Sequence, residues 1–543
     1  MFSEIADLAF INGNVITVDP NNSIVEAVAI KRNKIMRIGS TKEIKSFIGA
    51  NTNIINLKGK TLLPGFIDAH VHLASTAVCL AYMLRIHSPP IKSLSEILFK
   101  IKEKASQTPK GQWIIGRGSF LQPQKLIEKR YPSRSELDEA TSDHPVAIMA
   151  GLHYSMLNSK ALKLASISKE TPQPNFGHVF KDATTGEPTG ALSELFNTLP
   201  IPKWNYEQTR KAITAVSHDL FIRQGVTSIH EILDSAQNFR IYQELISNNE
   251  LPLRIRLYPV VPRQIELQCL LNIGLISGFG NDKLKLGGIK LFVDGGTSGG
   301  GAAMYEAYDN DPKNFGSLAM DQDKLTWTVV ESHKAGLQTV LHACGDKAQD
   351  MALKAIEAAL GEYPKEDHRH RIEHAGNYFA TSERIERMKK LGVVPVPNPQ
   401  MLNSFGDFLE EAFGKRAEKT FPFKSLLDSG IKFPITSDST GTQPEAINPL
   451  WGIWCTLARE TYSGRILCPE EKITLMDAIG MYTINAAYAG FEEDVKGSIE
   501  PGKLADVIML SDDITTVPVE KIKDVKVEMT IIDGKIVYQK NSF

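Results

Sequence analysis

The chain has 543 residues, of which 42% are hydrophobic and 23% charged, the composition of a globular protein with a large core. Its 61 basic and 63 acidic residues give a net charge of −2, and no basic block is interleaved with aromatic residues, which excludes nucleic acid as an expected partner. No apolar run approaches the roughly 18 residues that a membrane span needs, so we expect no contact with a membrane.

The first residues and the cysteines indicate the cellular compartment. Glu4 and Asp7 stand where a signal peptide needs basic residues, so export is not expected. The five cysteines are odd in number, scattered and without a Cys-x-x-Cys motif, which favours a reducing environment. We therefore expect a cytoplasmic protein. The sequence leaves the oligomeric state open and is compatible with a homo-oligomer.

The two ends of the chain are predicted to form one small β domain. Short apolar stretches alternate with turn residues over the first part of the chain, and 527–532 and 535–538 flank Asp533-Gly534, a two-residue hairpin signal. Neither end is long enough to bury a two-sheet core alone. We therefore expect residues 1–60 and 500–543 to build a shared β-sandwich, with two separate β extensions as the alternative.

Residues 61–499 alternate apolar strand candidates with helix-length amphipathic segments, which is typical of a parallel α/β structure. Strands are predicted at 66–71, 226–232, 254–260, 287–293, 338–343, 369–374, 393–397 and 432–437. Eight such units are what a closed (β/α)8 TIM barrel requires, and these barrels hold their chemistry at the C-terminal strand ends. The sequence therefore predicts an α/β barrel.

A long insertion interrupts this rhythm after the first strand. Residues 74–205 carry strands of their own, predicted at 113–116 and 146–150. Long inserts at this face of a barrel usually shape the pocket, so we expect a lid or a substrate-recognition subdomain. A stabilising or oligomerising appendage is the alternative.

Metal-binding side chains recur at the ends of the predicted strands. His70 and His72 occupy alternate positions at the end of the first strand, so they emerge on one face, and imidazole is the commonest protein ligand for zinc-like ions. His342, His374 and Asp438 end the fifth, sixth and eighth strands. Any single histidine has the ordinary interpretation of a satisfied core residue, but convergence at one barrel mouth predicts a metal site.

Lys290 lies within the otherwise apolar fourth strand. An unpaired ammonium is costly to bury, so this side chain needs either a partner or a chemical modification. A salt bridge to Asp294 or Glu373 would supply the partner.

This pattern resembles the amidohydrolase superfamily of metal-dependent hydrolases, with His-x-His after strand one, a lysine on strand four, histidines on strands five and six and an aspartate on strand eight. The resemblance covers nearly the whole chain. It is strongest to the branch called amidohydrolase family 3, with its YtcJ-like proteins and N-substituted formamide deformylases. The segments that carry this closer match are 153–162, 188–194, 225–230 and 497–506.

The resemblance implies one or two divalent ions. His70, His72 and Asp438 would hold the first, while His342 and His374 would hold the second, with N-carboxylated Lys290 as a bridge. Histidine with carboxylate suits zinc best, although iron, manganese, nickel and cobalt are admissible. The ion would lower the pKa of a bound water to about 7, and Asp438 would act as general base.

Further side chains are candidates for supporting roles. His230 or His153 could help to polarise the carbonyl, although His230 could be structural and His153 could cap a helix that begins near Asn158. Asp346 is expected to orient His342 through its second ring nitrogen.

Arg371 is expected to pair with a nearby acid, and Glu373 is a candidate for orienting the metal ligands through hydrogen bonds.

The expected function is hydrolysis of a carbon–nitrogen bond other than a peptide bond, in an amide or an N-formyl or N-acyl amine, with a small molecule as substrate. A deaminase of a nitrogen heterocycle is the enzymatic alternative. A non-catalytic regulator on the same fold ranks lowest because every ligand position is intact. The sequence does not identify the substrate, because specificity should lie in the insertion and the loops.

Overall fold

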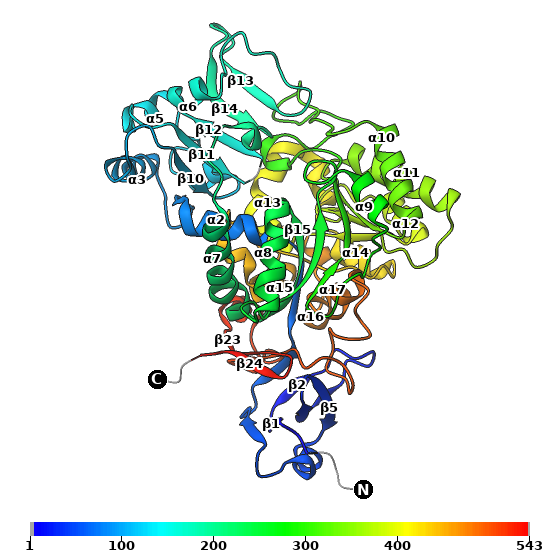
Figure 1. Ribbon diagram of the computed structural model, residues 1–543. Coiled ribbons are helices and arrows are strands. Elements are labelled where there is room, and N and C mark those ends of the chain that lie inside the picture. The colour runs from blue at the N-terminus through cyan, green and yellow to red at the C-terminus, as the bar shows by residue number, and fades with distance from the viewer. Residues whose placement is uncertain (1–4, 152, 541–543) are drawn as a thin grey trace.

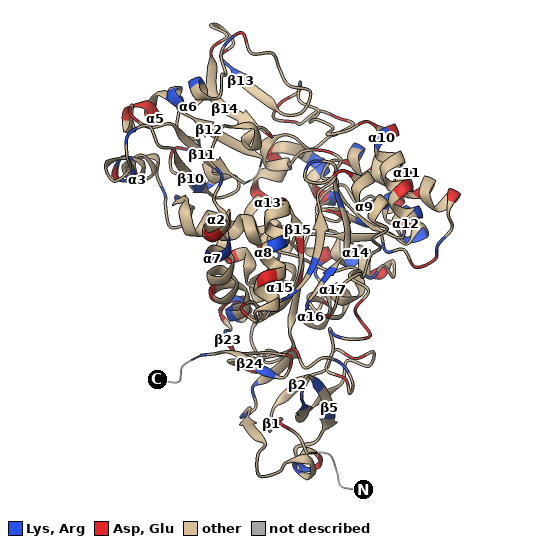
Figure 2. Cartoon of the chain, in the orientation of Figure 1, with Lys and Arg blue, Asp and Glu red and all other residues tan. Residues whose placement is uncertain are grey.

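The computed structural model of the chain describes residues 5–151 and 153–540. Figure 1 shows three parts: sheets formed near both termini at one end, a central body of strands and helices, and a further sheet at the opposite end. Basic and acidic side chains are interspersed over all three (Figure 2). Among the described residues, the search for helices found none with the length and apolar character of a membrane span.

Both ends of the chain contribute to the terminal sheets. One sheet has the order β5 (Lys34–Gly39), β4 (Ala27–Lys31), β1 (Leu8–Ile11) and β6 (Asn53–Asn56). The other has the order β24 (Lys535–Gln539), β23 (Val527–Ile532), β22 (Val507–Leu510), β7 (Thr61–Pro64), β2 (Asn14–Ile16) and β3 (Ile24–Val25). Ile508 pairs with Leu63, so the two ends share a sheet and the alternative of separate extensions is wrong.

Local chemistry and burial explain this arrangement. Asp533 and Gly534 both have positive φ, 56° and 69°, as the tight turn of the predicted hairpin requires. Phe10, Ile30 and Met529 are buried in one hydrophobic cluster that draws on both terminal sheets. Neither end could form this core without the other.

The central body contains two four-stranded parallel sheets. The first comprises β17 (Leu284–Leu286), β16 (Arg254–Pro259), β15 (Val226–Leu233) and β8 (Phe66–Val71). The second comprises β18 (Gly288–Phe292), β19 (Gln338–His342), β20 (Arg371–Glu373) and β21 (Val394–Val396). Every predicted barrel strand except the last is therefore observed, each close to its expected bounds.

The eighth predicted strand, 432–437, is extended chain without assigned strand pairing, so over residues 5–151 and 153–540 the strands do not close into one barrel. Isolated contacts still join the sheet edges. The amide of Thr436 donates to Pro397 O at 3.2 Å, and that of Asp438 donates to His70 O at 3.1 Å.

Helices surround these sheets (Figure 1). They are α2 (Leu73–Tyr82), α7 (Tyr206–Val216), α8 (Ala236–Ser247), α9 (Leu267–Ile273), α10 (Gln322–Lys334), α11 (Asp346–Glu362), α12 (Ser382–Leu391), α13 (Pro399–Phe413), α14 (Phe423–Asp428), α15 (Pro449–Ala458), α16 (Leu475–Met481) and α17 (Ile484–Ala489). The longest of these, α11, buries one face at helical spacing, including Ala348, Ala352, Ala355 and Ala359.

The insertion forms its own sheet, in the order β13 (His178–Lys181), β14 (Pro188–Ser193), β12 (Tyr154–Leu157), β11 (Val146–Ala150), β10 (Ile114–Gly118) and β9 (Leu84–Arg85). Its helices are α3 (Leu94–Ser106), α4 (Gln122–Lys125), α5 (Arg134–Ala140) and α6 (Ser159–Leu164). The strands predicted at 113–116 and 146–150 correspond to β10 and β11. A separate hydrophobic cluster that includes Ile97, Ile114 and Ile148 supports this sheet.

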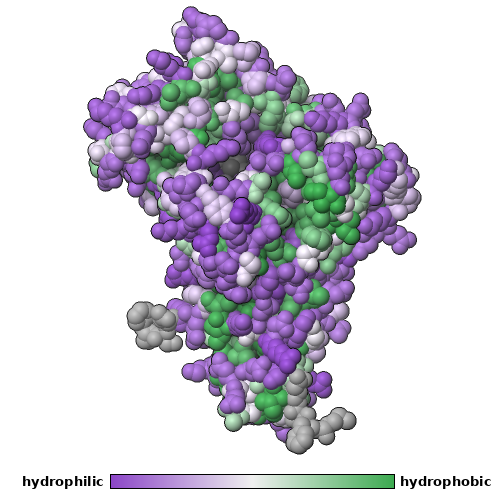
Figure 3. Space-filling model, in the orientation of Figure 1, coloured by the Kyte–Doolittle hydropathy of each residue, from purple (hydrophilic) through white to green (hydrophobic). Residues whose placement is uncertain are grey.

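An apolar region lies on the surface near α9. Figure 3 shows hydrophobic residues gathered over α9 and the chain that follows it, where Ile273, Ile276 and Phe279 are more than half exposed. An apolar groove lined by Leu270 and Leu286 lies there. It shares no residue with the pocket described next.

Candidate metal centre

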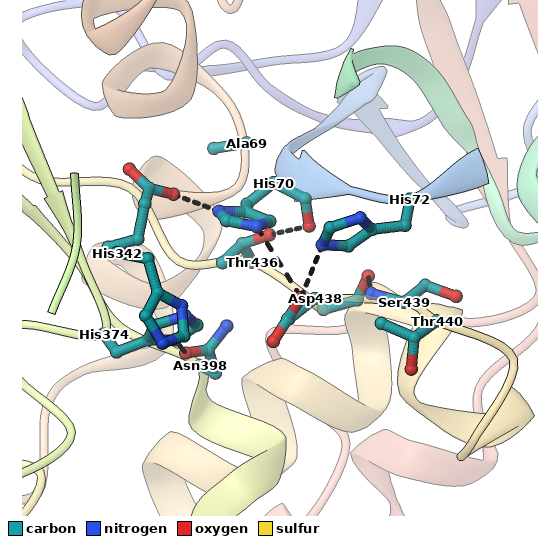
Figure 4. A network of polar contacts seen from close by, with 12 residues as sticks. Ala69, His70, His72, His342, His374, Asn398, Thr436, Asp438, Ser439 and Thr440 are labelled. Carbon is teal, nitrogen blue, oxygen red and sulfur yellow. Dashed lines mark hydrogen bonds and ion pairs between the residues drawn. The ribbon is translucent and has the colours of Figure 1, made fainter. Parts of the chain in front are cut away.

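Five of the predicted ligands meet at the C-terminal ends of the central strands (Figure 4). His70 lies in β8 and His72 directly follows it, His342 ends β19, His374 follows β20, and Asp438 follows the extended segment 432–437. Asp438 lies between the two pairs of histidines in this view. A small cavity of about 20 Å³ is lined by His342, His374 and Asp438, which is room for a single water-sized group.

His70, His72 and Asp438 form the first group of potential metal donors. Oδ1 of Asp438 lies 3.6 Å from Nε2 of His70 and 3.5 Å from Nε2 of His72. Two nitrogen or oxygen ligands held about 2.0–2.1 Å from one tetrahedral ion are separated by about 3.4 Å. The observed separations therefore fit a shared ion without rearrangement of these side chains.

The orientation of His70 is set by a buried carboxylate behind it. Nδ1 of His70 donates a hydrogen bond to Glu373, and Glu373 accepts two 2.9 Å hydrogen bonds from Arg371. Arg371 thus has the acidic partner that the sequence predicted. Because Nδ1 carries the hydrogen, the lone pair of His70 is on Nε2, facing Asp438.

Burial also sets the charge of these groups. Burial, with the positive charge of Lys290, lowers the pKa of His70 to about 3, so its ring is neutral and able to bind a cation. Burial opposes ionisation of Glu373, yet Arg371 and His70 hold the pKa of this carboxyl well below its usual range. Burial likewise opposes ionisation of Asp438, and its hydrogen bond with His72 and the nearby histidines hold its pKa low.

His342, Cys344 and His374 form the second group of potential donors. Nε2 of His374 lies 2.9 Å from Nδ1 of His342, while Nδ1 of His374 lies 2.8 Å from Oδ1 of Asn398. His374 has φ 69°, a left-handed backbone that is strained for a residue with a side chain. Asp438 shares this property with φ 48°, so each donor group contains one residue with a left-handed backbone.

Lys290, in β18, is completely buried. Within the described residues, its Nζ has no hydrogen-bond partner and forms no ion pair with Asp294 or Glu373. Burial lowers the pKa of Lys290 to about 8, which makes the neutral amine accessible. The orphaned amine fits an additional anionic or metal group at this position better than either salt bridge considered from the sequence.

The aspartate that contacts the second group is Asp294 rather than Asp346. Asp346 lies at the start of α11, where its carboxylate accepts a hydrogen bond from the amide of Tyr305 at 3.0 Å and does not orient His342. Oδ1 of Asp294 lies 3.7 Å from Nε2 of His342. Asp294 also accepts hydrogen bonds from the amides of Cys344 and Gly345, at 3.0 and 2.8 Å.

His153 reaches the cavity from the insertion. Its Nδ1 lies 3.0 Å from both carboxylate oxygens of Glu194, which also accepts the amide of Gly296 at 2.8 Å. Burial opposes protonation of His153, but Glu194 raises its pKa above the usual value. The helix α6 is capped by Asn158, so the capping role considered for His153 is wrong.

The family of the chain can be stated from its similarity to known proteins. A family model described as "Amidohydrolase family" matches residues 53–538. The chain belongs to this family. It is 29% identical to the N-substituted formamide deformylase of Arthrobacter pascens, over 99% of both chains. It is also 31% identical to Protein LONG AFTER FAR-RED 3 of Arabidopsis thaliana, over 98% of this chain and 92% of that one.

A solved structure shares the fold of this amidohydrolase. An uncharacterized metal-dependent hydrolase from Pyrococcus horikoshii superposes with a TM-score of 0.73 and 25% sequence identity, over 94% of this chain and 99% of that one. The mixed α/β architecture is therefore that of metal-dependent hydrolases.

One residue of this amidohydrolase that was considered for polarising the substrate carbonyl does not line the cavity. His230, in β15, is completely buried, and its Nδ1 lies 3.0 Å from Nη1 of Arg371. It belongs to neither of the two donor groups and contacts Arg371 instead, which favours the structural alternative. Sequence reasoning missed Glu194 and Asn398 because no local pattern signals a side chain whose partner is distant in the chain.

Proposed function

We propose that this amidohydrolase is a metal-dependent hydrolase of a carbon–nitrogen bond other than a peptide bond, with an amide or an N-formyl or N-acyl amine as substrate. The convergence of five donors carries the proposal: His342, His374 and Asp438 line one cavity, and donor atoms of His70 and His72 lie within 4.8 Å of that of Asp438. The named activity of the Arthrobacter pascens relative, a formamide deformylase, supports the choice of bond.

The proposed architecture assigns a role to each part of the chain. Residues 61–499 would form an open, distorted barrel, in which 432–437 takes the place of the eighth strand between β21 and β8 through the hydrogen bonds of Thr436 and Asp438. Residues 1–60 and 500–543 form a β-sandwich. The insertion, 74–205, closes over the site, which the position of His153 on the cavity wall supports.

The donor chemistry favours one or two divalent ions, with zinc as the first choice. His70, His72 and Asp438 would hold one ion, and His342 and His374 the other, with Lys290 as a bridging carbamate. Carboxylation would join the neutral amine to carbon dioxide and release one proton to solvent. When bound, such an ion supplies a Lewis acid that lowers the pKa of water to about 7 and polarises a carbonyl.

Two side chains of the protein would transfer protons and donate hydrogen bonds during the reaction. Asp438 accepts the proton of the attacking water and returns it to the leaving nitrogen, a role that its ionised carboxylate and its position between both groups support. His153, held by Glu194 on the opposite wall, donates a hydrogen bond to the substrate oxygen.

The test is the substitution Asp438→Asn with a panel of N-formyl and N-acyl amines. We expect the variant to fold and to lose hydrolysis by at least about a hundredfold, since general acid–base groups contribute roughly 10²–10⁴. Asp346→Asn is the matched control, because this aspartate lies outside the cavity, and it should keep activity. Undiminished hydrolysis by Asp438→Asn would refute its role, and ammonia release from heterocycles alone would indicate a deaminase.

A further inference from the structure

Cys344 is a potential donor that neither the predicted ligand set nor the proposed mechanism uses. It lies two residues after His342, is 5% exposed, and lines the same cavity as His342 and His374. Its Sγ lies 3.6 Å from Nε2 of His342, and donor atoms of Cys344, His342 and His374 all lie within 4.8 Å of one another.

The distance between sulfur and nitrogen matches two ligands of one ion. A zinc ion binds thiolate at about 2.3 Å and imidazole at about 2.0–2.1 Å, so a tetrahedral angle separates the two donors by about 3.6 Å. Cys344 and His342 already have this separation.

The backbone around Cys344 is also held firmly in place. Asp294 accepts the amides of Cys344 and Gly345, and a side-chain carbon added to Gly345 would lie only 1.9 Å from the carbonyl oxygen of Ala303. The close approach leaves no freedom for the chain to shift. The thiol is therefore presented at a fixed point beside the two histidines, as a preorganised ligand should be.

A second and independent observation points to a missing group at this place. Among the described residues, Nζ of Lys290 is buried without a hydrogen-bond partner, and its charge acts on His342, His374 and Cys344. Glu373 and Asp438 stabilise this charge at a distance, but no contact satisfies the buried amine itself. A thiolate or a metal-bound anion in this cluster would give it one.

We propose that Cys344 is a thiolate ligand of the ion held by His342 and His374. The inference rests on the proposed metal-dependent function and adds a soft sulfur donor to the second site. On binding, the S–H proton passes to solvent and the metal–sulfur bond forms without any redox change. A sulfur donor selects zinc, cadmium or cobalt over manganese and magnesium.

The experiment is X-ray absorption spectroscopy on the full-length, zinc-loaded protein carrying Cys269→Ser, which removes an exposed thiol that could bind zinc adventitiously. We expect a sulfur scatterer at about 2.3 Å together with nitrogen and oxygen at about 2.0–2.1 Å. Adding Cys344→Ser should abolish the sulfur signal. Adding Cys455→Ser, a buried cysteine of α15 outside the cavity, should leave it unchanged.

Cobalt gives a second readout. The cobalt-loaded protein should show a thiolate-to-metal charge-transfer band in the near ultraviolet, and this band should be lost in Cys344→Ser and kept in Cys455→Ser. If zinc and cobalt bind with nitrogen and oxygen ligands alone, the thiolate assignment is overturned while the proposed hydrolase stands. If neither ion binds the intact protein, both proposals fail. The spectra of the protein with Cys344 intact decide the question even if Cys344→Ser does not fold.

Discussion

At the scale of single residues, the site depends on a chain of contacts behind its ligands. Arg371 fixes Glu373, Glu373 fixes the ring of His70, and His70 then presents Nε2 to Asp438. Residues that orient a histidine ligand are typically worth ten- to a hundredfold in metal affinity. The Arg371 and Glu373 pair therefore matters for metal binding although neither side chain belongs to a donor group.

Substitution of Glu373 by Gln should weaken zinc binding by about ten- to a hundredfold, because the carboxylate that orients His70 is lost. It should also destabilise the fold by about 3–5 kcal/mol, because Arg371 is left as an uncompensated buried charge. Competition with a chromophoric chelator measures the affinity, and urea unfolding measures the stability. Glu357→Gln, which alters an exposed partner of Arg387, is the control. Equal zinc affinity in both variants would contradict the orienting role.

At the scale of elements, the loop after β19 is held by close packing against the segment near Ala303. A side-chain carbon at Gly345 would meet the carbonyl oxygen of Ala303 at 1.9 Å. Gly361, near the end of α11, has no atom within 4 Å of the same added carbon. A methyl group would therefore clash at Gly345, just before α11, but would be accommodated at Gly361, in its last turn.

We expect Gly345→Ala to destabilise the protein by about 1–3 kcal/mol, because the added methyl group forces the loop and Ala303 apart. Gly361→Ala should instead stabilise it by about 0.4–1 kcal/mol, since alanine restricts the unfolded chain. Urea unfolding of the two variants beside the parent protein measures both effects. If Gly345→Ala left the free energy of unfolding unchanged, the contact with Ala303 would not restrict this loop.

At the scale of the whole molecule, buried polar contacts fasten the three parts together. Arg254 of β16 forms a buried ion pair with Asp506, next to β22, and so ties the central body to the terminal sheets. On the other side, Nε2 of His87 donates a 2.7 Å hydrogen bond to the carbonyl oxygen of Gly441, joining the insertion to the loop that follows Asp438.

The contact at His87 should make stability depend on pH. Burial lowers the pKa of His87 to about 4, below its unfolded value near 6.5, so its contribution is present above pH 6.5 and is lost as the pH falls through 4. The shift corresponds to about 3 kcal/mol. His87→Gln keeps a donor but does not titrate, so the stability lost by urea unfolding between pH 7 and pH 4 should be smaller in the variant. An unchanged pH dependence would exclude this contribution.

The sequence predicted those features that depend on local spacing. Alternation placed His70 and His72 on one face, strand periodicity located the central strands other than β17, and Asp533-Gly534 signalled the terminal hairpin. The eighth predicted strand differed because 432–437 contacts its neighbours only through isolated hydrogen bonds, which depend on tertiary packing rather than on the apolar pattern. The site residue Asp346 was misplaced because proximity in sequence to His342 does not give proximity of side chains.

Sequence alone thus determined the main ligand candidates and the need of Lys290 for a partner, because these follow from residue type and from periodicity along the chain. The family followed from the resemblance of its motifs to those of known hydrolases. Only the tertiary structure decided that Lys290 has no ion pair, that Asp294 rather than Asp346 lies beside His342, and that Cys344 joins the second donor group. These are contacts between segments far apart in the sequence. Their distances are set by how the sheets and loops pack, which no local pattern encodes.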